Sequence, residues 1–156
     1  MKTLSIWVVE DDHLYRSMLL SYLAMLGYSP VGFDSGEECI LRLSEQPDVV
    51  LLDHNLGEGM KGLDVLRKIR GESPETKVIY ISGEERISLV SDVFQNGSQD
   101  FMTKDNASLL RLKLRLENIE SVKLMSKQKA RKRNIILVST AALLVLFVAF
   151  AARYYF

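Results

Sequence analysis

Short apolar runs alternate, over the first 120 residues, with longer stretches in which apolar residues recur every three or four positions. The short runs, rich in Val, Ile and Leu, are typical of strands buried on both faces, and the longer stretches are typical of amphipathic helices. Five strands are predicted, over Leu4–Val9, Ser29–Phe33, Asp48–Leu52, Lys77–Ile81 and Gln99–Met102. Because a helical stretch follows each strand, the pattern predicts five βα units that form a parallel sheet with helices on both faces.

The predicted helices carry start and stop signals. Gly27 is placed to end the first helix, and Ser35 is placed to cap the second. The helices are expected from the first strand to Gly27, over Gly36–Ser44, Leu63–Arg70 and Glu84–Gln95, and from near Asn106 onward.

Charge is spread unevenly along the chain. Residues 1–122 hold all 20 acidic residues and 13 of the 20 basic ones, a net charge of −7, whereas residues 123–156 hold seven bases and no acid. The acidic part has the size of one domain, and its charge argues against nonspecific binding of nucleic acid. A single cysteine, Cys39, excludes an internal disulfide and cysteine-rich zinc motifs.

Polar residues follow four of the predicted strands. They are Glu10, Asp11 and Asp12 after the first, Asp53 after the third, Ser82 after the fourth, and Thr103 and Lys104 after the fifth. Ligands of open α/β sheets bind at the carboxyl ends of the strands, so these residues are expected to gather at one edge. Mg²⁺ relieves repulsion among clustered carboxylates, and a carboxylate beside it can attack a phosphoryl group whose oxygens a lysine and a hydroxyl stabilise.

This order and spacing resembles the receiver domain of bacterial response regulators, the CheY-like domain of two-component systems, over roughly residues 3–120. The resemblance rests on Asp11-Asp12 after the first strand, Asp53 after Val49–Leu52, Ser82 after Val78–Ile81, and Lys104 after Asp100–Thr103. It implies a flavodoxin-like α/β fold, a doubly wound (βα)5 parallel sheet in the order 2-1-3-4-5.

The resemblance also implies roles for single residues. Asp53 is implied as the phospho-acceptor and Lys104 as the cation that pairs with the phosphoryl group. Ser82 is implied to move and hydrogen-bond that group, and Phe101 matches the aromatic switch position.

The implied cofactor is Mg²⁺. Its implied ligands are Asp11 or Asp12, Asp53 and the main-chain carbonyl of Asn55, and Asp12 is expected to be the more direct ligand of the acidic pair. Taken alone, Asp11 and Asp12 could instead cap the first helix. A transition-metal site at His13 and His54 is the less favoured alternative, because the neighbour of a buried strand residue points to the opposite face.

Three positions depart from the family pattern. Asp105 follows Lys104 where proline is usual, the loop after Asp53 is one residue longer with Gly57 where proline is common, and Phe101 lacks the hydroxyl of a tyrosine.

Residues 135–152 are 18 consecutive residues without a charge. At about 1.5 Å per residue they span roughly 27 Å as a helix, close to the ~30 Å hydrocarbon core of a bilayer. The bases just before them place the preceding domain in the cytoplasm. A buried or oligomer-forming helix is the alternative. The expected parts are a receiver domain (1–120), a basic juxtamembrane helical linker (121–133), a transmembrane helix (134–153) and a short far-side tail (154–156).

The resemblance and the tail together imply a single-domain response regulator anchored in the bacterial inner membrane. A histidine kinase or histidine phosphotransfer protein would phosphorylate it, and it would signal by protein contact or act as a phosphate relay or sink. It is expected to catalyse only its own phosphorylation and dephosphorylation. The alternatives are a phosphorylation-independent membrane adaptor and a Mg²⁺-dependent phosphohydrolase, which would need a second acid where Asn55 stands. A homodimer through the anchor stays open, without support from a Gly-xxx-Gly motif.

Overall fold

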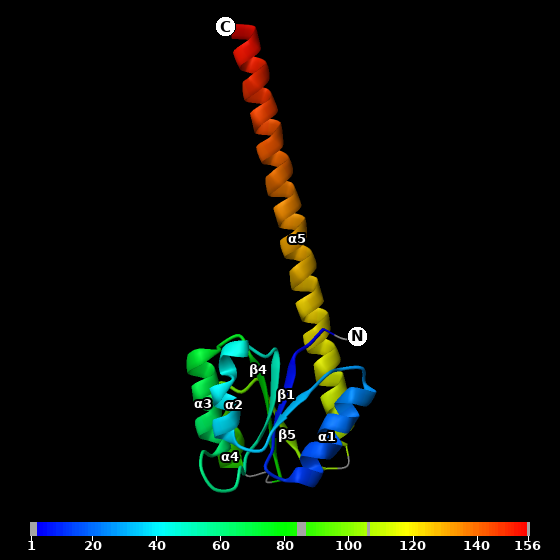
Figure 1. The fold of residues 1–156 in the computed structure, drawn as a ribbon, viewed down its shortest axis with the longest axis vertical. Helices are drawn as coiled ribbons and strands as arrows, with labels where there is room; N and C mark the ends of the chain where they lie inside the picture. Colours follow the sequence, from blue (N-terminus) through cyan, green and yellow to red (C-terminus); the bar gives the residue numbers. More distant parts are fainter. Residues whose placement is uncertain (1–2, 84–86, 106, 156) are drawn as a thin grey trace. The chain divides into compact units, whose positions relative to one another are not determined.

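The computed structural model describes residues 3–83, 87–105 and 107–155 (Figure 1). The chain divides into two compact units, Met1–Leu114 and Arg115–Phe156. The first unit holds the sheet and its covering helices, and the second consists of the remainder of the last helix, so each is described by itself.

The first unit contains a five-stranded parallel sheet in the order β2-β1-β3-β4-β5, which confirms the predicted flavodoxin-like fold. Its strands are β1 (Ile6–Val9), β2 (Val31–Phe33), β3 (Val49–Asp53), β4 (Lys77–Ser82) and β5 (Asp100–Thr103). All five predicted strands are present, and none of their ends differs from the prediction by more than two residues.

The helices follow the strands as predicted. They are α1 (His13–Met25), α2 (Gly36–Leu41), α3 (Gly62–Glu72), α4 (Ile87–Gln95) and α5 (Ser108–Tyr155). The second predicted helix is shorter than expected, because its last turn tightens into the 3₁₀ helix η1 (Leu43–Glu45) and the chain then turns at Gln46 with φ 51°. The predicted starts of the fourth and last helices, near residues 84 and 106, lie outside the described residues.

Strand side chains alternate between two faces of the sheet. Trp7, Val50 and Tyr80 belong to a buried cluster on the face covered by α2, α3 and α4, whereas α1 covers the other face (Figure 1). Cys39 of α2 lies in the same cluster, and burial raises its pKa to about 12. A thiol that stays protonated in an apolar core acts as a small apolar residue.

Gly27 and Gly71, each near the end of a helix, differ in backbone conformation and so test what that conformation contributes to stability. Gly27 has φ +90° with open space around its Cα, and Gly71, near the end of α3, has similar space without positive φ. We expect Gly27→Ala to lower the free energy of unfolding by about 1 kcal/mol through strain, and Gly71→Ala to raise it by about 0.5 kcal/mol by restricting the unfolded chain. Urea unfolding followed by the fluorescence of Trp7 measures both, and equal shifts in one direction would contradict the assignment.

Candidate functional site

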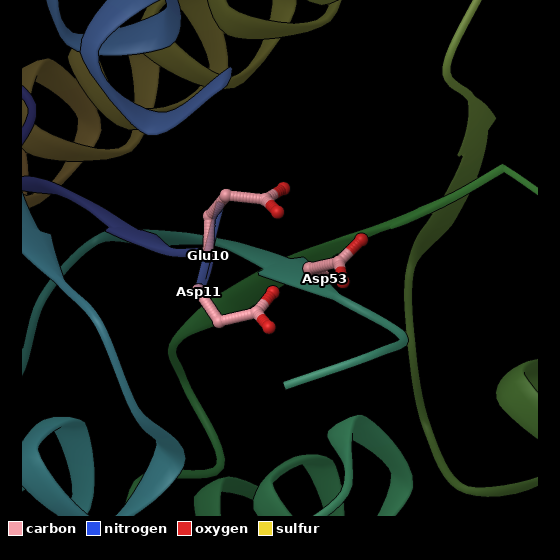
Figure 2. Close-up of side chains that lie close together, drawn as sticks. All are labelled: Glu10, Asp11 and Asp53. Atoms are coloured by element: carbon pink, nitrogen blue, oxygen red, sulfur yellow. The ribbon is translucent and has the colours of Figure 1, made fainter. Parts of the chain in front are cut away.

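Three acidic side chains converge where β1 and β3 end. Val9 pairs with Leu52 in the parallel register, so Glu10 and Asp53 come next at the same edge of the sheet. Asp11 completes the cluster, in which one oxygen from each of the three carboxylates lies within 4.8 Å of the others. Figure 2 shows the three side chains pointing into the same space. Glu10 and Asp53 are buried and Asp11 is exposed, so the cluster is open to solvent on the Asp11 side.

Lys104 neutralises the two buried carboxylates. Its Nζ lies 2.8 Å from Glu10 Oε2 and 2.9 Å from Asp53 Oδ1. The ring of Tyr15 covers the same ammonium, with its centroid 4.5 Å from Nζ. A cation over an aromatic face is stabilised by the ring, so Lys104 is held from three sides.

Burial dominates the ionisation of the two buried acids. It raises the pKa of Glu10 to about 7, with the charge of Asp53 adding to the shift and the hydrogen bond to Lys104 opposing it. Burial likewise raises the pKa of Asp53 against the opposing effect of Lys104. Burial alone would lower the pKa of Lys104, but its hydrogen bonds to Glu10 and Asp53 raise it. The lysine therefore stays charged, and the acids carry an unfavourable excess of negative charge.

Asp12, expected to be the more direct metal ligand, lies outside this cluster. Its Oδ1 accepts hydrogen bonds from the main-chain N–H of Leu14 at 2.8 Å and of Tyr15 at 3.1 Å, which makes it the N-cap of α1. These hydrogen bonds lower the pKa of Asp12. The structure thus places the residue before the predicted acidic pair, Glu10, in the cluster and gives Asp12 a helix-capping role.

The other predicted residues lie around the cluster. Ser82 is buried at the end of β4, and its main-chain oxygen accepts from Lys104 N at 2.9 Å. The main-chain N–H of Asn55 donates to Asp53 Oδ2 at 2.7 Å. Phe101 is half-buried in β5, with its ring stacked on Tyr80 at a centroid distance of 6.4 Å. The edge of the sheet therefore brings Asp53, Ser82 and Lys104 together, while Phe101 packs against the core cluster on the face covered by α2, α3 and α4.

Among the described residues, neither histidine joins the acidic cluster. His54 is half-buried, and its Nδ1 lies 2.9 Å from the hydroxyl of Tyr80, a residue of the core on the α2–α4 face of the sheet. His13 is exposed at the start of α1. The acidic cluster is therefore an all-oxygen donor set.

Asp105 fixes the loop that carries Lys104. Its carboxylate accepts from Thr103 Oγ1 at 2.6 Å and from Ala107 N at 2.8 Å, and it pairs with Arg111. The hydroxyl of Thr103 and the guanidinium of Arg111 lower the pKa of Asp105 to about 2. This chain has Asp105 where the resembled family usually has proline, and the hydrogen bonds and ion pair of its carboxylate hold the loop.

Comparisons with known proteins agree with this arrangement. Residues 6–117 match the family model of the response regulator receiver domain. This chain belongs to the response regulator receiver family. The receiver domain is 33% identical over 112 residues to a cyclic di-GMP phosphodiesterase of Thermotoga maritima, covering 71% of this chain and 30% of that protein. It is 33% identical over 100 residues to the DNA-binding transcriptional regulator NtrC of Salmonella typhimurium, covering 64% of this chain and 21% of that protein.

A solved structure agrees as well. The receiver domain of NtrX from Brucella abortus superposes with a TM-score of 0.69 at 26% identity, covering 75% of this chain and 98% of that one. The chain spans less than a third of the length of the two curated relatives, and what they do as whole proteins belongs to them.

Sequence reasoning expected Glu10 at this edge but did not choose it for the acidic group around Asp53, and it overlooked Tyr15. Glu10 could have been chosen by counting, because it follows the four apolar residues of β1 just as Asp53 follows Val49–Leu52. Tyr15 gave no comparable signal, because its contact with Lys104 joins segments that lie far apart in the sequence.

Removal of Lys104 gives a pH-dependent prediction. The pKa of Glu10 is about 7 in the folded state, above its ordinary value of 4.5. Between these two pH values, Glu10 keeps its proton in the folded state and loses it in the unfolded state. The free energy of unfolding therefore falls as pH rises through this range. Without Lys104 the acids lose their counter-charge. We expect Lys104→Met to lower the free energy of unfolding by about 2 kcal/mol at pH 8 and by clearly less at pH 5.5.

Urea unfolding in EDTA at the two pH values measures this difference. Asp53→Ala is the control, since it removes one buried carboxylate and leaves the pair of Glu10 and Lys104 in place. It should cost little stability at either pH. A loss in Lys104→Met that is the same at pH 5.5 and pH 8 would show that Lys104 does not offset the charge of Glu10.

Proposed function

We propose that this chain is a membrane-anchored response regulator that accepts a phosphoryl group on Asp53 from a histidine kinase or a histidine phosphotransfer protein. The observation that carries the proposal is the contact of Lys104 Nζ with both buried carboxylates, at 2.8 Å and 2.9 Å. A charged lysine beside a carboxylate at the open edge of the sheet is the arrangement that phosphoryl transfer to that carboxylate requires.

The proposed reaction forms an acyl phosphate. An oxygen of the Asp53 carboxylate attacks phosphorus, the N–P bond of the phosphohistidine breaks, and the imidazole leaves with the electron pair of that bond. Lys104 exchanges its contact with Asp53 Oδ1 for the new phosphoryl oxygens, and the hydroxyl of Ser82 donates to one of them. The chain catalyses no other reaction in this proposal.

The proposed Mg²⁺ ligands are the carboxylates of Glu10, Asp11 and Asp53 and the main-chain carbonyl of Asn55. We set aside Asp12 as a direct ligand, because its carboxylate already accepts two main-chain hydrogen bonds at the start of α1. The all-oxygen donor set suits Mg²⁺, which usually keeps several waters and binds one or two carboxylates directly, so the third carboxylate would act through a bound water. When bound, Mg²⁺ neutralises charge on the phosphoryl oxygens.

Phosphorylation is proposed to be read out through Phe101 and the surface formed by α4, β5 and α5. The ring of Phe101 stacks on Tyr80, whose hydroxyl contacts His54, the residue after Asp53. Movement of Ser82 toward the phosphoryl group would change the packing of this row of side chains. The resulting shift between two conformations would be recognised by a protein partner. Alternatively, the phosphorylated chain would act as a phosphate relay or sink.

The membrane anchor is the second part of the proposal. By length and composition, α5 is long and apolar enough to cross a membrane. Its large apolar side chains between Ile135 and Phe150 are exposed where they are described. The bases before Ile135 and the absence of acids after Glu120 favour retention of the receiver on the cytoplasmic side. Anchoring would raise the concentration of the receiver near membrane-bound kinases.

Phosphorylation is tested on the full chain in detergent micelles. We expect incubation with acetyl phosphate and Mg²⁺ to add one phosphoryl group to the intact mass of the wild type. The adduct should be absent from Asp53→Ala and from samples with excess EDTA. An unmodified wild type that is folded by circular dichroism would contradict the proposal and favour the phosphorylation-independent adaptor.

Membrane anchoring is tested by fractionation after expression in bacteria. We expect removal of residues 134–156 to move the protein from the membrane pellet to the soluble fraction after carbonate washing, because the whole uncharged run is lost. The matched control removes only residues 154–156, keeps that run and should stay in the pellet. A shortened chain that still sediments with the membrane would contradict the anchor.

A further inference from the structure

We infer that Glu37, on α2, is a positioning residue for the Mg²⁺ site, because it holds the loop of residues 55–61 against the carboxylate of Asp11. The inference rests on the proposed function and concerns the loop that is one residue longer than the resembled pattern. Glu37 itself lies outside the acidic cluster and acts only through this loop.

Both ends of the loop are fixed near Asp53. At its start, the N–H of Asn55 donates to Asp53 Oδ2 at 2.7 Å. At its end, the N–H of Gly62 donates to the main-chain oxygen of His54 at 3.2 Å. The conformation between these points decides how the loop meets the acidic cluster.

Gly57 brings the loop into contact with a proposed metal ligand. A Cβ at this position would lie 3.1 Å from Asp11 Oδ2, which is tighter than ordinary packing, so the loop passes close to that carboxylate at Gly57. Gly57 has φ +62°, a conformation closed to proline, whose ring fixes φ near about −65°. The positive φ and the close approach of the loop to Asp11 both favour glycine at this position.

Glu37 holds the opposite side of the loop. Its Oε1 accepts from the N–H of Met60 at 2.8 Å, and a Cβ on Gly59 would lie only 2.7 Å from the same oxygen. Lys61 Nζ donates to the main-chain oxygen of Gly57 and closes the loop on itself. The middle of the loop is thus clamped between α2 on one side and Asp11 on the other.

This clamp prepares the site for a metal ion. Binding would use the carboxylate of Asp11 and the carbonyl of Asn55, and both belong to or contact the loop. A loop that is already ordered loses little conformational entropy on binding, whereas a released loop must be ordered at the expense of affinity. Removal of outer-shell partners typically lowers metal affinity by about 10-fold to 100-fold, and Glu37 acts one step further out.

The experiment titrates the full chain in detergent micelles with MgCl₂ and follows the amide chemical shift of Asn55. We expect Glu37→Ala to raise the Kd for Mg²⁺ by about 10-fold, the lower end of outer-shell effects. Glu37→Gln keeps an oxygen that can accept from Met60 and should stay within about 2-fold of the wild type. Gly57→Ala should also weaken binding, with Glu37 intact, because its Cβ would press on Asp11.

Glu38→Ala is the matched control. Glu38 follows Glu37 in the same helical turn, is also exposed, and accepts none of the hydrogen bonds that the loop donates within the described residues. Its removal changes the charge equally and should leave the Kd unchanged. Equal weakening by Glu37→Ala, Glu37→Gln and Glu38→Ala would reveal a simple charge effect and overturn the inference.

The two proposals fail in different ways. If the wild type binds Mg²⁺ and is phosphorylated while Glu37→Ala has an unchanged Kd, only the role of Glu37 is wrong. If the wild type shows neither Mg²⁺ binding nor the phosphoryl adduct, the proposed function fails and the role of Glu37 fails with it. Phosphorylation of Glu37→Ala at saturating Mg²⁺ should be retained, because Glu37 does not touch the reacting carboxylate.

Discussion

The ammonium of Lys104 lies between the buried carboxylates of Glu10 and Asp53, and the acidic edge of the sheet depends on this contact. Two buried acids side by side repel each other and are costly to desolvate, as the raised pKa of Glu10 shows. Lys104 reaches them because β5 ends beside β4 and because Asp105 holds the following loop. The ion pair therefore ties the outer strand of the sheet to its centre, and a change in charge at Asp53 is felt directly in the β5–α5 loop.

Three consecutive acids at the end of β1 have three different tasks, and the local backbone explains the division. Glu10 continues the edge of the sheet and is buried beside Asp53. Asp11 lies in the turn, where its carboxylate meets solvent on one side and Gly57 on the other. Asp12 has extended backbone just before α1 and caps it. Only the first two belong to the cluster in this structure, because the third carboxylate accepts hydrogen bonds from the first turn of the helix.

The fold could be predicted from the sequence because its signals are local. A few neighbouring residues are enough to recognise a buried strand, a helix cap or a helix stop. The structure contains the strands, the cap at Ser35 and the stop at Gly27. The members of the acidic cluster could be predicted only in part. The end of β1 at Val9 was predicted correctly, so the preference for Asp12 came from the family resemblance and not from the strand boundary. That Glu10 lies beside Asp53 while Asp12 caps α1 depends on how the chain turns after β1. The contacts of Tyr15 and Glu37 join distant segments, and no local pattern marks them.

The neutral chain consists of two oppositely charged parts, and on the proposed function this separation has a physical use. A net charge of −7 over residues 1–122 is repelled by anionic lipid, whereas the seven bases of residues 123–156 are attracted to it. The tail would then stay at the membrane while the acidic domain is kept from adsorbing to the lipid surface. Tethered to the same bilayer as a membrane-bound kinase, a receiver needs only a weak docking contact, because the local concentration compensates for low affinity. Weak docking also allows rapid release after transfer, which a relay that returns or passes on phosphate requires.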